Sequence, residues 1–196
     1  MSILFLSNNP QVSDTLYNWL VSREERVIYQ SEPINRAFVE DYAIHFIVSY
    51  NYQHIIQQDV LQMMPRQAVN LHISLLPYNR GFSPNIWSFI DKTPSGVTIH
   101  EMDAGIDTGD ILLQQRVVFD PEKETLRSSY NKLHEMIQAL FCENWGRIQT
   151  LRIEPKKQIG AGTVHTKADE SFFAPIVDYD DTIIDFISKV NGINPA

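Results

Sequence analysis

The stretch Asn70-Leu-His-Ile-Ser-Leu-Leu-Pro-Tyr-Asn-Arg-Gly81 carries the strongest structural signal in this chain of 196 residues. A short apolar run over residues 68–71 predicts a buried strand. Side chains alternate along a strand, so Asn70 and His72 are expected to point to the same side. The Pro and Gly residues that follow predict a turn. A polar strand end that opens into such a loop is where open α/β sheets place their ligands.

Neither residue is decisive by itself. Asn70 alone can cap a turn, and His72 alone can be a hydrogen-bonded core histidine. A second polar segment, Asp103-Ala-Gly-Ile-Asp-Thr-Gly-Asp110, follows the next predicted strand. Asp107 lies between two glycines there, which is typical of a turn residue. The hypothesis of a functional site therefore depends on the combination of the two segments.

The first half of the chain alternates short apolar runs with segments of helical spacing. Strands are expected near residues 3–6, 26–29, 46–48 and 68–71, and helices over residues 10–20, 33–43, 60–64 and 84–90. This alternation predicts an α/β, Rossmann-like fold with a mostly parallel twisted sheet and helices on both faces. The sequence contains no G-x-G-x-x-G after the first strand and no P-loop motif.

The pattern changes after Gly96. Two β-rich segments at residues 97–99 and 111–118 are expected to add antiparallel or edge strands. The longest helix is predicted over residues 123–149, with an apolar stripe that packs on the sheet. A small strand over residues 163–167 and a final helix over 178–190 follow. We expect one domain over residues 1–150 and a C-terminal extension over 151–196, packed on that domain or on a partner chain.

Composition limits the kinds of partner. The formal net charge is −8, which argues against nucleic acid and anionic membranes as partners. Cys142 is the single cysteine, so no internal disulfide can form, and it is expected to be a buried thiol in a helix. The N-terminus lacks the features of a signal peptide, and no apolar run is long enough to span a membrane. These features predict a cytoplasmic protein.

Asn70, His72 and Asp107 are the residues that we expect to act chemically, and they suit acyl transfer to an amine. The attack of an amine on a carbonyl builds negative charge on oxygen, which an amide N–H and an imidazole can stabilise. The attacking nitrogen must also lose a proton, which a carboxylate or imidazole can accept directly or through one water.

The combination of Asn70-x-His72, Ser-Leu-Leu-Pro77 and Gly105-Ile-Asp-Thr-Gly-Asp-Ile-Leu112 resembles the superfamily of formyltransferases that use a formylated tetrahydrofolate. The resemblance runs from about residue 45 to 118. It implies that Asn70 and His72 contact the formyl oxygen and that Asp107 assists proton transfer. It departs from the family at Ile73, where Pro is usual, and in the first loop, Ser7-Asn-Asn-Pro10.

The resemblance also implies a formyl donor, N10-formyltetrahydrofolate. Its pterin ring is expected to bind main-chain groups of two loops, whose residues are Gln53, His54 and Ile55, and Met102, Asp103 and Ala104. His100 is expected to face the folate loop or the core, and Glu101 the opposite side. A metal site is disfavoured because no local ligand spacing such as H-E-x-x-H is present.

The acceptor is expected to be a nucleotide-linked amino-dideoxy sugar. The tracts over residues 81–87 and 162–169 resemble the sugar N-formyltransferases, which suggests polysaccharide biosynthesis, and the formylation domain of nonribosomal peptide synthetases is also similar. The substrate-binding residues expected here are Tyr78, Arg80, Phe82 and Trp87. Arg80 can meet a diphosphate, or can simply be a surface charge. A homodimer is a possible assembly.

Two alternatives stay open. The same chemistry can act on another amine, namely aminoacyl-tRNA, a ribonucleotide amine or a carrier-bound amino acid. The acidic charge speaks against the first of these, as does the lack of the C-terminal domain and basic loop of the transfer-RNA enzyme. A folate-binding module without catalysis is the second alternative, and the presence of all three expected catalytic residues disfavours it.

Overall fold

The structure is a computed structural model that describes residues 1–24 and 26–193, and the chain divides into two compact units. The first unit comprises Met1–His72, Ile99–Leu113 and Gln138–Gln158, and the second comprises Ile73–Thr98, Gln114–Ile137 and Ile159–Ala196. The expected division into a domain over residues 1–150 and an extension over 151–196 stays a prediction.

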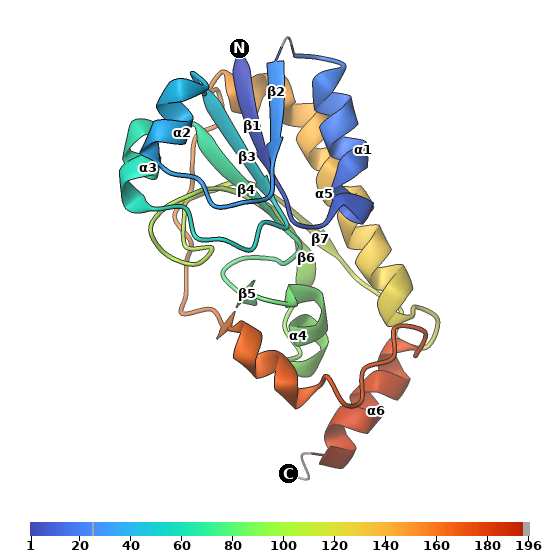
Figure 1. The fold of residues 1–196 in the computed structure, drawn as a ribbon. Coiled ribbons are helices and arrows are strands. Elements are labelled where there is room, and N and C mark those ends of the chain that lie inside the picture. The colour runs from blue at the N-terminus through green and yellow to red at the C-terminus, as the bar shows by residue number, and fades with distance from the viewer. Residues whose placement is uncertain (25, 194–196) are drawn as a thin grey trace. The chain divides into compact units, whose positions relative to one another are not determined.

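One sheet has six strands in the order β2-β1-β3-β4-β6-β7 (Figure 1). Their bounds are β1 Ser2–Leu6, β2 Arg26–Gln30, β3 Phe46–Tyr50, β4 Ala68–His72, β6 Ser95–Glu101 and β7 Ile111–Val117. β1 pairs in parallel with both β2 and β3, and β3 pairs in parallel with β4. Every residue of β1 and β3 is buried, as a parallel strand covered on both faces requires.

β6 runs against this direction, and β7 is the edge strand of the sheet, in line with the antiparallel or edge strands expected from the sequence. The amide of Met102, just after β6, donates to the carbonyl of Ala68 at the start of β4 over 2.9 Å. β6 therefore ends where β4 begins. The amide of Glu101 donates to the carbonyl of Asp110 over 2.9 Å, which closes a hairpin into β7. The expected α/β fold with a mostly parallel sheet is confirmed.

Helices of the first unit cover both faces of the sheet (Figure 1). Leu4 and Leu6 of β1 share one core cluster with residues of α2 (Arg36–Asp41) and α3 (Gln58–Met63). Phe5 lies between them in sequence and points to the other face, where its ring centroid is 5.8 Å from that of Tyr17 in α1 (Pro10–Val21). The C-terminal part of α5 (Leu126–Gln149) covers the same face. Successive side chains of β1 therefore pack alternately against the helix layers on the two faces of the sheet.

The second unit has its own apolar core. α4 (Pro84–Ile90), the first turns of α5 and α6 (Ile183–Ile193) meet there. Its fully or nearly fully buried members are Ile86, Trp87, Phe89, Leu126, Phe173, Ile183, Phe186 and Val190. A two-stranded parallel sheet pairs β5 (Arg80–Gly81) with β8 (Val164–His165), and a 3-10 helix, η1 (Lys167–Phe172), follows. The sequence analysis did not anticipate β5 or η1.

The final helix starts later than the expected residue 178. Thr182 accepts the amide of Asp185 over 3.2 Å and donates to its carboxylate over 2.6 Å, so this pair caps the helix just before Ile183. Asp178 instead accepts the amide of Asp180 in a turn, over 3.0 Å. Residues 178–181, which the predicted helix included, therefore form a turn that precedes it.

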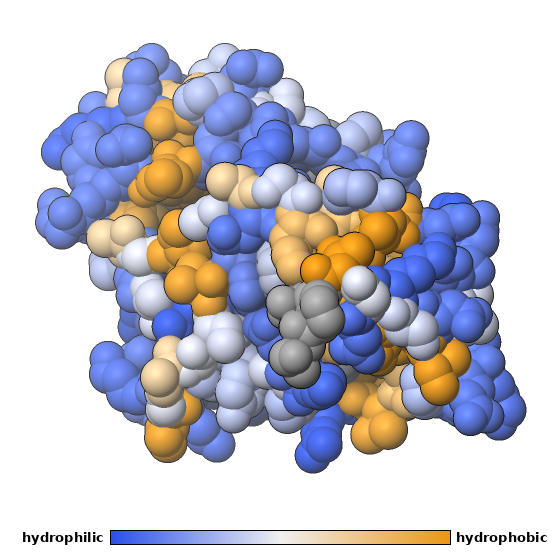
Figure 2. Space-filling view, turned by 90° about the horizontal axis from the view of Figure 1, so that it is seen from below, coloured by the Kyte–Doolittle hydropathy of each residue, from blue (hydrophilic) through white to orange (hydrophobic). Residues whose placement is uncertain are grey.

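Among the described residues, no helix has both the length and the apolarity that crossing a bilayer requires. The face in Figure 2 shows hydrophobic groups in several separate patches among hydrophilic ones. Exposed large apolar side chains of this kind include Ile55, Val118 and Ile159. Scattered exposure of this sort is ordinary for folded chains and identifies no partner surface. The expected homodimer stays a prediction.

Candidate active site

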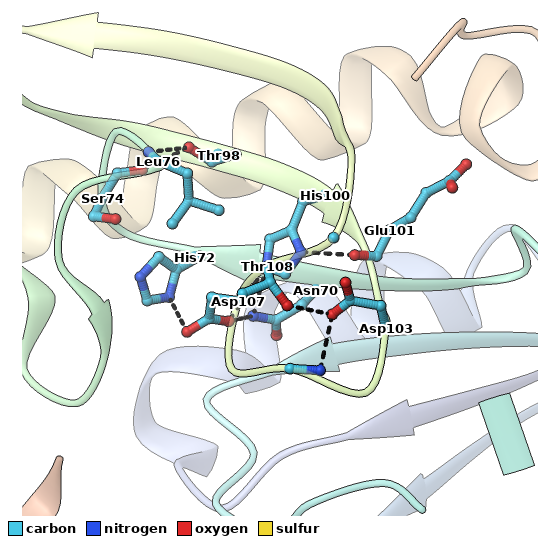
Figure 3. A network of polar contacts seen from close by, with 12 residues as sticks. Asn70, His72, Ser74, Leu76, Thr98, His100, Glu101, Asp103, Asp107 and Thr108 are labelled. Atoms are coloured by element: carbon cyan, nitrogen blue, oxygen red, sulfur yellow. Dashed lines mark hydrogen bonds and ion pairs between the residues drawn. The ribbon is translucent and has the colours of Figure 1, made fainter. Parts of the chain in front are cut away.

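The polar end of β4 forms the base of the site, and it lies in the first unit. Val69 and Leu71 point into the core and are buried. The strand alternation therefore turns Asn70 and His72 to a common side (Figure 3), as the sequence predicted. His72 is buried and Asn70 is half-buried. Two polar side chains are thus set side by side on a rigid strand.

Asp107 comes from the loop between β6 and β7, and this loop is held from several directions. The carboxylate of Asp103 accepts the Thr108 hydroxyl over 2.6 Å and the amide of Gly105 over 3.1 Å. The side chain of Gln158 donates to the carbonyls of Asp107 and Gly109, each over 2.8 Å. Asp107 has a φ of 51°, a left-handed conformation that Asp tolerates better than most residues. The loop therefore presents its carboxylate in one fixed orientation.

The Asp107 carboxylate lies at the centre of the site (Figure 3). Its Oδ1 accepts the Asn70 amide Nδ2 over 3.0 Å and lies 3.3 Å from His100 Nε2. Its Oδ2 lies 3.6 Å from His72 Nδ1. The carboxylate side chain is 14% exposed, so water screens these contacts only weakly. The three side chains expected from the sequence therefore meet, and a fourth joins them.

His100 is the fourth residue, and the sequence analysis did not assign it to the site. Its Nδ1 lies 2.8 Å from the carbonyl oxygen of Glu101, which can only accept, so Nδ1 carries a hydrogen. Its Nε2 then faces Asn70 Nδ2, a donor, at 3.3 Å and the Asp107 carboxylate, an acceptor. The imidazole of His100 therefore lies between a donor and an acceptor, at 3.3 Å from each.

The pairing of β4 with β6 brings His100 to the site, and the sequence alone does not give this register. The paired strands place Ala68 opposite Met102, and counting inwards from that pair puts residue 100 opposite Asn70. An imidazole directly opposite an expected catalytic amide is a strong candidate for the same site. The expected opposite orientation of Glu101 is consistent with its ion pair to Arg66, at 2.9 Å.

This arrangement can polarise a carbonyl and move a proton. An amide N–H and an imidazole are suited to an oxygen that becomes negative, and such a donor contributes about 2.7–4 kcal/mol to the transition state. The Asp107 carboxylate contacts two imidazoles and an amide. It can take a proton from an attacking amine directly or through one water. No covalent intermediate on the protein is needed for this reaction. The site is therefore suited to direct acyl transfer.

The comparisons with known proteins agree with this chemistry. A family model described as formyl transferase matches residues 20–144. The chain belongs to this formyl transferase family. Asn70, His72, His100 and Asp107 all lie within the matched residues. The recognition of the superfamily from the sequence is confirmed.

Solved structures of the formyl transferase family share the whole fold. The formyltransferase PseJ from Anoxybacillus kamchatkensis, in complex with UDP-4,6-dideoxy-4-formamido-L-AltNAc and tetrahydrofolate, is 34% identical. That likeness has a TM-score of 0.87 and covers 97% of this chain and 100% of that one. A 4-N formyltransferase from Francisella tularensis is 22% identical, with a TM-score of 0.79 over 96% of this chain and 85% of that one, and it shows the likeness of fold alone.

Curated relatives in the family are methionyl-tRNA formyltransferases. The protein from Lachnospira eligens is 32% identical over 165 residues, which are 82% of this chain and 52% of that protein. The protein from Desulfotalea psychrophila is 34% identical over 164 residues, which are 79% of this chain and 47% of that protein. The chain thus spans about half the length of these relatives.

The two loops expected to bind the folate lie in the first unit and are held in part by side-chain contacts. The amide of Gln53 donates to Asn8 Oδ1 over 3.0 Å, and His54 packs edge-on against Tyr52 with ring centroids 5.2 Å apart. Ile55 is 73% exposed. In the other loop, Met102 packs against the core, Asp103 supports the turn and Ala104 is exposed. Binding of the folate by these loops stays a prediction.

The residues expected to bind the acceptor belong to the second unit. Tyr78 is 37% exposed, and Arg80 and Phe82 are half-buried on either side of Gly81. Trp87 is buried, and its ring stacks on His165 at 3.8 Å with an interplanar angle of 1°. Binding of the acceptor by these four residues stays a prediction.

A cavity of about 540 Å³ opens at the carboxyl ends of β1 and β2. It is lined by Ser7, Asn8, Pro10, Asp14, Tyr17, Asn18, Tyr29 and Ser31. None of the four clustered polar residues lines it. The cluster around Asp107 and this cavity are therefore separate features, and the catalytic roles expected for the cluster stay predictions.

Proposed function

We propose that this chain moves a formyl group from N10-formyltetrahydrofolate to the amino group of a nucleotide-linked amino-dideoxy sugar. The observation that carries the proposal is the cluster of Asn70, His72 and His100 around the Asp107 carboxylate, with Asn70 Nδ2 and Asp107 Oδ1 only 3.0 Å apart. In this reaction the sugar amine attacks the formyl carbon, its carbon–nitrogen bond forms, and the bond from the formyl carbon to N10 of the folate breaks.

Each residue then has a role in that sequence. Asn70 and His72 bind the formyl oxygen as it becomes negative. Asp107 takes the proton that the attacking amine loses, and N10 of the folate gains a proton as it leaves. His100 contacts both Asp107 and Asn70 and keeps these two side chains in position relative to each other. The donor is supported by family membership and by the tetrahydrofolate in the structure from Anoxybacillus kamchatkensis.

A sugar acceptor is supported by that same structure, because its likeness extends over both whole chains. Its bound sugar nucleotide, UDP-4,6-dideoxy-4-formamido-L-AltNAc, already carries a formamide at position 4. The matching amine, in which hydrogen replaces the formyl group, is the first acceptor to test. We propose the same class of acceptor for this chain, with polysaccharide biosynthesis in the cytoplasm as its context.

The test incubates the purified chain with N10-formyltetrahydrofolate and a panel of UDP- and dTDP-linked amino sugars. Mass spectrometry should detect the addition of one formyl group to at least one sugar, with release of one tetrahydrofolate per product. The His72→Ala protein is the control and should give no product. Absence of turnover with every sugar of the panel contradicts the proposal.

The curated relatives favour a second candidate, which is formylation of methionyl-tRNA. The net charge of −8 disfavours a polyanionic acceptor, because such binding depends on cationic contacts to phosphates. The assay should therefore also include methionyl-tRNA as an acceptor. Turnover with the tRNA and with no sugar would establish the second candidate, whereas folate binding without any turnover would indicate a binding module.

A further inference from the structure

A network of polar contacts in the second unit ties the segment after Gly162 to the loop expected to bind the acceptor. The carboxylate Oδ2 of Asp91 lies 2.8 Å from His165 Nε2 and accepts Asn79 Nδ2 over 3.2 Å. Asn79 is fully buried, and its Oδ1 accepts the Thr93 hydroxyl over 2.6 Å. Asp91 therefore joins the end of α4 to β8 and to the loop before β5.

The backbone strengthens the same connection. β5 and β8 pair in parallel, with the amides of Arg80 and Phe82 donating to the carbonyls of Thr163 and His165, each over 3.0 Å. Gly81 has a φ of 89°, and a Cβ there would lie 2.2 Å from the carbonyl oxygen of His165. The two segments thus approach too closely for any residue but glycine.

His165 lies at the centre of this connection. One face of its ring stacks on the buried Trp87, and its Nε2 binds Asp91, so that two side chains fix its orientation. The side chains of His165 and Asp91 are 15% and 23% exposed, so the contact is only partly screened by water. Because the carbonyl of His165 accepts the Phe82 amide, a fixed His165 also fixes the backbone around Arg80.

The residues 162–169 that carry β8 lie outside the residues 20–144 that match the family model. The catalytic cluster lies inside them. Arg80 and Asp91 lie inside the matched residues, so only the β8 segment of this network lies outside the match. A segment outside the match that holds the loop of Arg80 is suited to choosing an acceptor, and not to the chemistry that the family shares. The diphosphate of a sugar nucleotide is a small anionic group, which one guanidinium can bind in a defined geometry.

We propose that His165 and Asp91 are positioning residues that hold Arg80 for the diphosphate of the acceptor. This inference rests on the proposed sugar-nucleotide acceptor. It predicts that these residues act on binding of the acceptor, while the transfer step and the binding of the folate do not depend on them. The contact between His165 and Asp91 therefore contributes to the KM for the sugar nucleotide.

The test compares His165→Phe with the wild type. Phe keeps an aromatic ring to stack on Trp87 and loses the bond to Asp91. We expect the KM for the sugar nucleotide to rise about tenfold, as for loss of a partly exposed hydrogen bond to a charged group. The kcat should stay within about twofold, and the KM for N10-formyltetrahydrofolate should not change. Asp91→Ala should give the same rise, and the double variant should add little to it.

Arg127→Gln provides the matched control, because it breaks an exposed ion pair to Asp180 in the same unit. Its KM values should equal those of the wild type, and thermal unfolding should show that every variant is folded. A folded His165→Phe protein with an unchanged acceptor KM overturns this inference and leaves the proposed function standing. A wild type that formylates no sugar nucleotide overturns the proposed function and this inference with it.

Discussion

The side-chain amide of Asn70 lies 3.0 Å from a carboxylate oxygen of Asp107, a residue 37 positions further along the chain. The contact joins a rigid strand to a loop that four hydrogen bonds hold in place. It fixes the carboxylate relative to both imidazoles, so that the geometry of proton transfer exists before a substrate binds.

Replacing Asp107 by Asn tests whether its charge matters. Asn keeps the shape of the side chain but cannot accept the proton of the attacking amine. We expect kcat to fall by at least about 100-fold, the usual contribution of a general base, with folate binding retained in a calorimetric titration. Asp110→Asn is the control, since that residue pairs with the exposed Lys157 at 3.2 Å, and it should keep wild-type kcat. Equal activity of the two variants would exclude Asp107 as the base.

His100→Gln should distinguish a positioning role from a structural one. Gln can still form hydrogen bonds, but it lacks the rigid ring that places Nε2 3.3 Å from both Asn70 Nδ2 and Asp107 Oδ1. We expect kcat to fall about tenfold, less than for His72→Ala, because His100 acts through its neighbours. The midpoint of urea unfolding and the KM for the folate should stay close to those of the wild type. A loss of kcat that appears only together with a lower urea midpoint would assign His100 to packing alone.

Gly109 and Gly146 form a matched pair of glycines for a steric test. A Cβ at Gly109 would lie 1.8 Å from the carbonyl oxygen of Glu101, whereas one at Gly146 would meet nothing within 4 Å. Gly109→Ala should displace the loop of Asp107, lowering kcat and destabilising the fold by about 1–3 kcal/mol. Gly146→Ala lies within α5 and should stabilise by about 0.5–1 kcal/mol. Urea unfolding measures both changes, and a stabilised Gly109→Ala protein would contradict this packing.

His134 makes the stability of the fold depend on pH. Burial lowers its pKa from 6.5 to about 4 in the folded chain. The unfolded chain therefore binds more protons than the folded one between these two values, and stability is lost as the pH falls through this window. At pH 5 the loss is about 2 kcal/mol relative to pH 8.

His134→Gln removes this titration, so the variant should lose about 2 kcal/mol less than the wild type between pH 8 and pH 5. Urea unfolding at the two pH values gives the comparison. For each protein, the free energy of unfolding at pH 5 is subtracted from that at pH 8, and the two differences are compared. This comparison is independent of any constant destabilisation by the substitution. Parallel losses in both proteins would show that His134 does not titrate in this range.

Local rules were sufficient to predict the sheet and the common side of Asn70 and His72. β4 turns Asn70 and His72 to one side because strand geometry has a period of two. The Gly- and Asp-rich loop was predictable because the residues around Asp107 favour turns. The family motif placed both segments in one site, which spacing alone could not have done. Their chemical roles stay predictions.

The features that the sequence analysis missed depend on contacts between distant segments. His100 joins the site only because β6 runs antiparallel to β4 and places residue 100 opposite Asn70. β5 has two residues, which are too few for a periodic sequence pattern to predict its pairing with Val164 and His165. α6 starts late because the two hydrogen bonds between Thr182 and Asp185 cap the helix just before Ile183. The acidic residues before Thr182 gave no sign of this boundary in the sequence.

The partner of His100 Nδ1 is a main-chain carbonyl, that of Glu101. Every amino acid brings that carbonyl to position 101, so evolution can change the side chain there, and with it the ion pair to Arg66, without altering which ring nitrogen is protonated. The tautomer of this imidazole therefore depends on the path of the backbone and not on the side chain at position 101.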